Sequence, residues 1–82
     1  MTNQNTFELT IAKVNEQLFS GEALSVNVPG TEGEMTILAH HEPLITMLKK
    51  GIITVRDGEN TKTFSIEKGM LETSNGQVTV LV

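Results

Sequence analysis

The sequence contains no cysteine, which excludes disulfide bonds, thiolate catalysis and cysteine-ligated zinc. It has no tryptophan or tyrosine and only three phenylalanines, so few side chains are suited to stacking on bases. Six basic residues stand against ten acidic ones, the net charge is −4, and Lys49-Lys50 is the only adjacent basic pair. Because no basic stripe is present to neutralise phosphates, we expect no nucleic-acid partner.

Long hydrophobic runs are also missing. The first ten residues have neither the basic start nor the apolar segment of a signal peptide. No stretch approaches the roughly 20 apolar residues that cross a bilayer. We therefore expect a soluble protein, cytoplasmic by default. A single domain of this size has a folding free energy of only about 4 to 12 kcal/mol.

Apolar and polar residues alternate along most of the chain, which is typical of half-buried strands. The segment from 13 to 19 is ambiguous and is interpreted as a connection or a short edge strand. Ser20-Gly21 and Pro29-Gly30 are expected to end the strands before them. The segment from Leu44 to Leu48 has apolar residues at both odd and even positions, so its periodicity does not distinguish a strand from a helical turn. Its length favours a strand. The alternating segments are Phe7 to Ile11, Glu22 to Val28 and Met35 to Ile37.

One hairpin register follows from parity. A four-residue loop from Asp57 to Asn60 pairs Arg56 with Thr61 and places Ile53 opposite Phe64. An odd-length loop would set apolar side chains against polar ones, because a slip of one residue reverses every side chain. The even loop is therefore predicted.

Asn75-Gly76 is the strongest hairpin signal, because both residues tolerate the positive φ of a type I′ turn. It places Ser74 opposite Gln77 and Leu71 opposite Val80. With no convincing helix anywhere, the sequence predicts an all-β fold, a flattened β-sandwich or barrel of about ten short strands.

Polar chemistry concentrates in the middle of the chain. His40 and His41 point to opposite faces of a regular strand, so they share a metal only if the backbone turns sharply between them. Glu32 and Glu34 share a face, but no apolar group flanks them closely, and no serine or cysteine nucleophile has a recognisable base partner. We therefore expect no catalytic residue, no metal and no cofactor. A metal-dependent enzyme of the cupin kind, using both histidines, is one alternative.

In the predicted registers, some apolar side chains point away from the core face of their strands. Ile52 faces away from Ile53, and Ile45 and Met47 face away from Leu44 and Leu48. These side chains either fill a corner of the core or form a docking surface. A free-standing β-sandwich module that binds a peptide or sugar is accordingly a second alternative.

Several short motifs, in this order, resemble the N-terminal domain of the epsilon subunit of F-type ATP synthases. They are FSG at Phe19 to Gly21, EGEM at Glu32 to Met35, HEPL at His41 to Leu44, GIITV at Gly51 to Val55, and GMLE followed by VTVL at Val78 to Leu81. The resemblance implies a non-catalytic rotor subunit of the central stalk, peripheral at the cytoplasmic face of the energy-coupling membrane. It would bind the gamma subunit and the c-ring, and so couple proton or sodium flow to ATP synthesis.

The resemblance also assigns residues. It implies a c-ring interface at Glu32, Glu34 and Met35, and a gamma interface at Lys13, His41 and Thr46. Many relatives carry glycine at the positions of Thr36 and His40, which leaves the local loop shape open. We expect residues 1–82 to form the epsilon-type domain. The C-terminal helical hairpin of full-length relatives, which restrains ATP hydrolysis and in some binds ATP, is absent from these residues.

Overall fold

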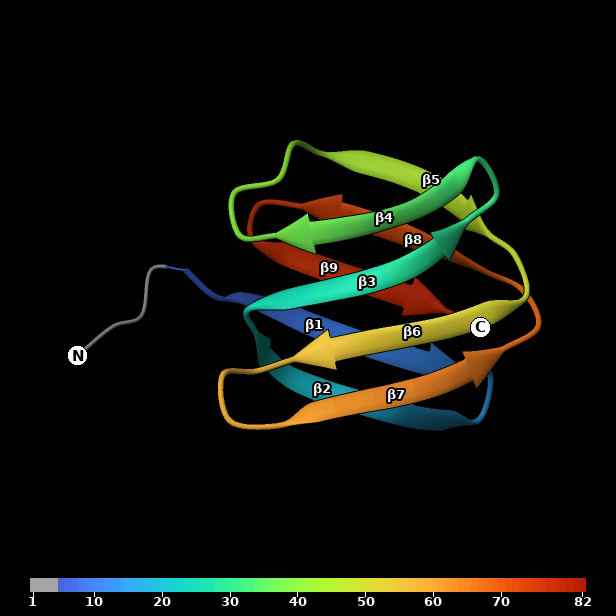
Figure 1. The fold of residues 1–82 in the computed structure, drawn as a ribbon, viewed down its shortest axis with the longest axis horizontal. Coiled ribbons are helices and arrows are strands. Elements are labelled where there is room, and N and C mark those ends of the chain that lie inside the picture. Colours follow the sequence, from blue (N-terminus) through green and yellow to red (C-terminus); the bar gives the residue numbers. More distant parts are fainter. Residues whose placement is uncertain (1–4) are drawn as a thin grey trace.

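The computed structural model describes residues 5–82, which form nine strands and no helix (Figure 1). No helix in this range is therefore available to cross a membrane. The strands are β1 (Phe7–Lys13), β2 (Glu16–Ala23), β3 (Ser25–Gly30), β4 (Gly33–Leu38), β5 (Leu44–Leu48), β6 (Gly51–Arg56), β7 (Thr61–Ile66), β8 (Gly69–Ser74) and β9 (Gln77–Leu81).

The strands form one hydrogen-bonded sheet in the order β2-β1-β9-β8-β5-β3-β6-β7, with β4 paired to β3. This sheet curls over on itself, so that β4, β3, β6 and β7 form a front layer over a back layer of β5, β8, β9, β1 and β2 (Figure 1). Strand β3 links the layers, since Gly30 pairs with Leu48 of β5. The prediction of an all-β sandwich is confirmed.

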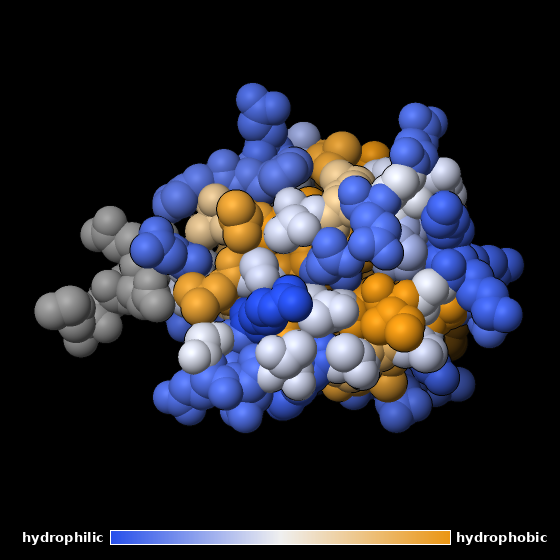
Figure 2. All heavy atoms as spheres, in the orientation of Figure 1, coloured by the Kyte–Doolittle hydropathy of each residue, from blue (hydrophilic) through white to orange (hydrophobic). Residues whose placement is uncertain are grey.

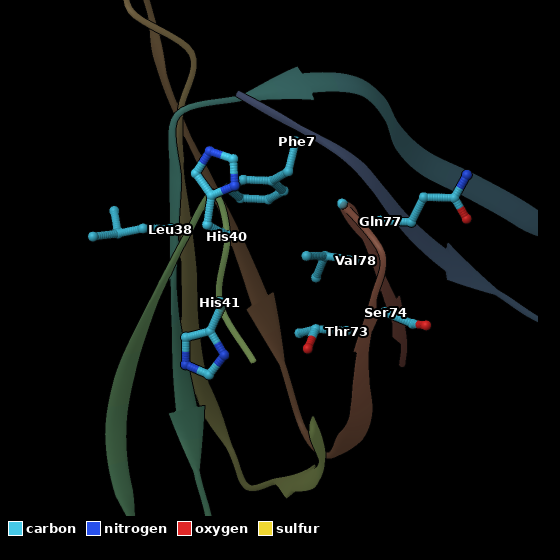
Figure 3. Close-up of a pocket in the computed structure, with 9 residues that line it drawn as sticks. Phe7, Leu38, His40, His41, Thr73, Ser74, Gln77 and Val78 are labelled. Carbon is cyan, nitrogen blue, oxygen red and sulfur yellow. The ribbon is translucent and has the colours of Figure 1, made fainter. Parts of the chain in front are cut away.

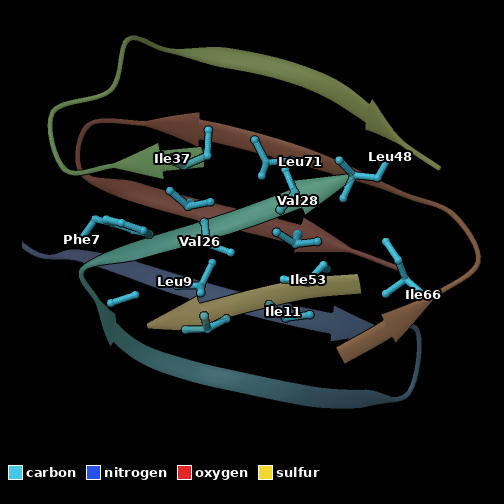
Figure 4. Close-up of a cluster of buried hydrophobic side chains, with 14 residues drawn as sticks. Phe7, Leu9, Ile11, Val26, Val28, Ile37, Leu48, Ile53, Ile66 and Leu71 are labelled. Atoms are coloured by element: carbon cyan, nitrogen blue, oxygen red, sulfur yellow. The ribbon is translucent and has the colours of Figure 1, made fainter. Parts of the chain in front are cut away.

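Side chains from both layers meet in one hydrophobic core (Figure 4). The alternation along β1 leaves Phe7, Leu9 and Ile11 buried, and the strands of the front layer bury their own alternate residues in the same way. Burial of alternate side chains is the stabilising result of period-two patterning. The largest fully buried side chains are Leu9, Ile11, Ile37, Ile53, Leu71, Val26, Val28, Val55 and Val80.

Both hairpin registers argued from the sequence are confirmed. Arg56 pairs with Thr61 across the loop that follows β6. At the other hairpin Ser74 pairs with Gln77. Asn75 and the glycine after it have φ of 50° and 78°, the positive values that a type I′ turn needs.

The turn predicted at Ser20-Gly21 is wrong. Strand β2 runs through this dipeptide, with Ser20 opposite Thr10 and Gly21 opposite Leu9. The chain instead reverses at residues 14 and 15, between β1 and β2. Of the two readings of the ambiguous segment, the edge strand is the one observed. Pairing with β1 outweighs the local turn preference of Ser-Gly.

The single strand predicted from Glu22 to Val28 is also wrong, because the chain breaks at Leu24. The Leu24 N–H donates to the Arg56 carbonyl at 2.7 Å as the chain passes from the back layer to the front layer. The break reverses the alternation, so Ala23 is fully buried and Leu24 only half-buried.

The strand end predicted at Pro29-Gly30 is confirmed, because β3 ends at Gly30. Pro29 pairs with Glu34, and its carbonyl accepts a hydrogen bond from the Lys49 N–H at 2.8 Å. Proline lacks an N–H but keeps this acceptor, which is why it is accommodated at the end of β3.

Side chains close the sandwich where the two ends of the curled sheet, β2 and β7, meet. The rings of Phe19 and Phe64 form an edge-to-face contact with centroids 6.4 Å apart. The Lys62 ammonium lies 5.4 Å from the centroid of the Phe19 ring. Contacts of these two kinds are each worth about 0.5 to 1.5 kcal/mol.

Gly69 at the start of β8 leaves no room for a side chain. A Cβ there would lie 2.6 Å from the Leu81 carbonyl oxygen, which is backbone and cannot swing away. We expect Gly69→Ala to lower the free energy of unfolding by about 1 to 3 kcal/mol, as overpacking does. Urea denaturation followed by circular dichroism measures this loss. The exposed neighbour offers a control, Lys68→Ala, and equal midpoints for the two variants would contradict the steric argument.

Candidate interaction surfaces

The hairpin between β3 and β4 presents two carboxylates. Gly30 pairs with Gly33, so the reversal consists of Thr31 and Glu32 alone. Glu32 and Glu34 are both exposed. Met35 pairs with the buried Val28 and packs against the core. Of the three residues assigned to a c-ring interface, two therefore face solvent and Met35 faces inward.

A second turn lies directly against this hairpin. The Thr31 N–H donates to the Met47 carbonyl at 3.0 Å, in addition to the bond between Lys49 and Pro29. A Cβ on Gly51 would lie 2.7 Å from the Pro29 Cβ, which shows how closely the two turns pack. The backbone therefore fixes the two turns relative to each other.

The two turns together place both signs of charge at one end of the molecule, in a charged turn surface made of Glu32, Glu34, Lys49 and Lys50. All four side chains are exposed. Within residues 5–82, none of them forms a hydrogen bond or ion pair with another side chain. Sequence reasoning did not assign the two lysines to an interface, although they are the only adjacent basic pair.

The three residues assigned to a gamma interface are not brought together. Lys13 ends β1, whereas His41 follows β4, at the opposite end of the molecule (Figure 1). Thr46 lies between them on β5, paired with the buried Leu71, and is itself half-buried.

The two histidines line a small pocket of about 10 Å³ with Phe7, Thr73 and Gln77 (Figure 3). Figure 3 shows the rings of His40 and His41 directed to different parts of the rim. His40 has φ of 68°, a positive value that is uncommon for a residue other than glycine.

Two other residues that line this pocket, His41 and Thr73, form hydrogen bonds to the same backbone carbonyl. The His41 ring donates from Nδ1 to the Glu42 carbonyl at 2.8 Å, and the Thr73 hydroxyl donates to the same oxygen at 2.9 Å. Between residues 5 and 82, no group of three or more His, Cys, Asp or Glu residues is arranged to hold a metal ion. A metal site of the cupin kind needs at least three protein ligands, and residues 5–82 contain no such group.

Apolar side chains are exposed on the outer face of the back layer. Met47 pairs with Met70, and Met70 pairs with Leu81, so the three form a row across β5, β8 and β9. With Ile45 they form an outer strip, in which Ile45 is 66%, Met47 55% and Leu81 47% exposed. Ile52, 54% exposed, lies in the front layer and is not part of the strip. The interpretation of Ile45, Met47 and Ile52 as a core corner is wrong.

Comparison with known proteins adds a family. Residues 6–82 match the family described as "ATP synthase, Delta/Epsilon chain, beta-sandwich domain". The ATP synthase epsilon chain of Caulobacter vibrioides is 43% identical over 65 residues, covering 79% of this chain and 76% of that relative. The ATP synthase epsilon chain 2 of Nitrobacter hamburgensis is 37% identical over 75 residues, covering 92% and 55%.

Two solved structures share the fold. A chain in the cryo-EM structure of the Euglena gracilis mitochondrial ATP synthase, OSCP/F1/c-ring, superposes with a TM-score of 0.87 at 24% identity, covering 100% of this chain and 52% of that one. A chain in the central stalk/c-ring structure from Tetrahymena thermophila gives 0.79 at 12% identity, covering 99% and 66%. This chain thus spans between half and about three quarters of the length of the four proteins. With the family model covering residues 6–82, the chain belongs to the ATP synthase delta/epsilon family, and these residues form its beta-sandwich domain.

Proposed function

We propose that this domain is a non-catalytic part of the rotor of an F-type ATP synthase. It binds the gamma subunit, rests on the c-ring, and lies peripherally at the cytoplasmic face of the energy-coupling membrane. Its role is mechanical, because torque generated by proton or sodium flow through the ring must reach the catalytic head without slip. The family membership of residues 6–82 supports the proposal, as does the fold shared with chains of two ATP synthase assemblies that include a c-ring.

The charged turn surface is the observation that carries the proposal. Two exposed carboxylates without partners in the described chain suit a basic residue on a polar loop, with which they make charge-assisted hydrogen bonds. Lys49 and Lys50, held beside them, restrict the fit to a partner that also offers acceptors. Mixed charge of this kind contributes more to specificity and orientation than to affinity.

The gamma-facing surface centres on β5. Ile45 and Met47 of the outer strip flank Thr46 in the sequence, although the half-buried Thr46 side chain points to the other face of β5. His41 precedes the same strand. Exposed Met and Leu side chains in a contiguous row are suited to burial against a partner, since each gives up water-exposed apolar area at about 25 cal/mol per Å². Lys13, at the far end of the molecule, extends the proposed contact along its length.

A pull-down from detergent-solubilised membranes of the source organism tests this function. The tagged domain is expected to retain both the gamma subunit and the c-ring, and outer-strip variants such as Met47→Asp are expected to lose gamma. Recovery of neither partner would contradict the rotor role and leave the free-standing peptide- or sugar-binding module as the better description.

A further inference from the structure

An open depression lies in the front layer at the end away from the charged turn surface. It occupies about 430 Å³ between the beginning of β3, the end of β4 and the turn that follows β6. The two surfaces are at opposite ends of β6, since Gly51 begins that strand beside the charged turns and Arg56 ends it. The lining residues are Leu24, Ser25, Leu38, Arg56, Glu59 and Asn60, with Gly58 and Thr61.

Part of the lining is apolar. Leu38 is 56% exposed at the end of β4, and Leu24 is half-buried at the break before β3. The backbone of Gly58, with φ of 99°, approaches closely enough that a Cβ there would lie 3.2 Å from Leu24 Cδ1. Figure 2 shows apolar patches on this face of the molecule, set among pale and blue side chains. The two leucines thus offer a partly exposed apolar surface at the edge of the front layer.

Arg56 supplies a positive charge, and the adjacent Asp57 carboxylate is hydrogen-bonded to backbone N–H groups rather than to the guanidinium. The Oδ1 of Asp57 accepts hydrogen bonds from the Glu59 N–H at 3.0 Å and the Asn60 N–H at 2.7 Å. These backbone donors hold the pKa of the Asp57 carboxyl below its usual value. Across residues 5–82, no hydrogen bond or ion pair engages the exposed Arg56 guanidinium.

We propose that this depression binds an aliphatic monocarboxylate, with the carboxylate on Arg56 and the alkyl group against Leu24 and Leu38. The planar guanidinium presents paired N–H donors that match the two oxygens of a carboxylate. Sites that combine an apolar lining with a few polar groups are typical of small-ligand pockets. Glu59 also lines the depression, and its negative charge opposes the ligand and disfavours dicarboxylates. A fatty acid and a peptide ending in leucine share the required chemistry.

This inference goes beyond the proposed function and does not depend on it. The depression lies at the opposite end of the front layer from the charged turn surface, and the outer strip lies on the back layer. A failed pull-down of gamma and the c-ring would therefore leave the proposed ligand site standing. Failure of ligand binding would likewise leave the proposed rotor function standing.

Titration of the ¹⁵N-labelled domain with octanoate, followed by amide chemical shifts, tests the proposal. We expect saturable shifts confined to residues that line the depression. 1-Octanol, which has the alkyl chain without the charge, and acetate, which has the charge without the chain, should each bind at least tenfold more weakly. Equal shifts with 1-octanol, or shifts spread over the whole surface, would overturn the proposal.

Variants locate the site. Arg56→Met keeps much of the aliphatic volume, removes the charge, and is expected to weaken octanoate binding at least tenfold. Lys68→Met removes an exposed cation between β7 and β8, away from the depression, and should leave octanoate binding unchanged. Glu59→Gln should tighten binding. Arg56→Met binding octanoate as the parent chain does would overturn the assignment.

N-acetyl-leucine separates the two sources of the ligand chemistry. Binding that is tighter than that of octanoate and lost in Arg56→Met identifies a peptide terminus as the ligand. Weaker binding identifies a fatty acid. Absence of Arg56-dependent binding for both probes would overturn the site altogether.

Discussion

Replacing Leu71 with alanine should lower the free energy of unfolding by about 2 to 5 kcal/mol. Leu71 is fully buried on β8, where it pairs with Thr46 of β5 on one side and Val80 of β9 on the other. Truncating a buried leucine removes its transfer free energy and leaves a cavity, at a cost of about 2 to 5 kcal/mol. A domain of this length has only about 4 to 12 kcal/mol in total. At the middle of both ranges the expected loss is therefore roughly two fifths of its stability.

Urea denaturation followed by circular dichroism measures the effect, with Glu72→Ala as the matched control. Glu72 is the next residue on β8, but its side chain is exposed, so its truncation should change stability by less than about 0.5 kcal/mol. The contrast between adjacent residues tests the inward and outward alternation of β8 directly. Similar midpoints for both variants would show that Leu71 is not a core residue in solution.

The parts of the fold that the sequence predicts well are those in which turn chemistry and side-chain parity agree. Asn75-Gly76 combines two residues suited to positive φ with flanking strands whose buried residues then face one another. The loop from Asp57 to Asn60 is fixed in the same way, by the requirement that Ile53 meet Phe64. Both hairpins join strands that are adjacent in the chain, so local information is sufficient.

The parts that sequence reasoning missed are those in which strand pairing outweighs the local sequence signal. Ser20-Gly21 has turn chemistry, but β1 supplies Thr10 and Leu9 as pairing partners and keeps it extended. The strand ending at Ala23 breaks at Leu24 because the Arg56 carbonyl, from a strand far along the chain, takes its N–H. Neither pairing partner is visible from the local pattern.

For the interaction surfaces too, the sequence predicts which side chains of a strand are exposed but not which strands lie side by side. Exposure of Ile45 and Met47 follows from the parity of β5, whereas their continuation through Met70 to Leu81 requires the order β5-β8-β9. Likewise, the proximity of Lys49 to Glu32 depends on hydrogen bonds between two turns that belong to different hairpins. Sequence alone identified the carboxylates through family resemblance and offered no means of placing the lysines beside them.

Reversing the charge of Glu34 should weaken assembly of the domain onto the c-ring at least tenfold while leaving its fold intact. Under the proposed function, Glu34→Lys replaces an attraction to a basic loop residue with repulsion. Juxtaposed like charges cost up to several kcal/mol, and about 1.4 kcal/mol corresponds to a factor of ten in affinity. Glu34 is exposed on the edge strand β4, and its side chain has no partner in the part of the chain that the structure describes. The isolated domain should therefore keep its stability to within about 0.5 kcal/mol.

Retention of the c-ring in pull-downs and ATP-driven ion pumping in reconstituted membranes measure the two consequences, loss of assembly and loss of coupling. Glu22→Lys is the control, because it makes the same change of charge on another exposed residue, at the end of β2 away from the charged turn surface. If both variants impair assembly equally, net charge rather than position is responsible. Because exposed ion pairs are screened by salt, the defect of Glu34→Lys should also shrink as ionic strength rises. Undiminished coupling in fully assembled enzyme would remove Glu34 from the interface.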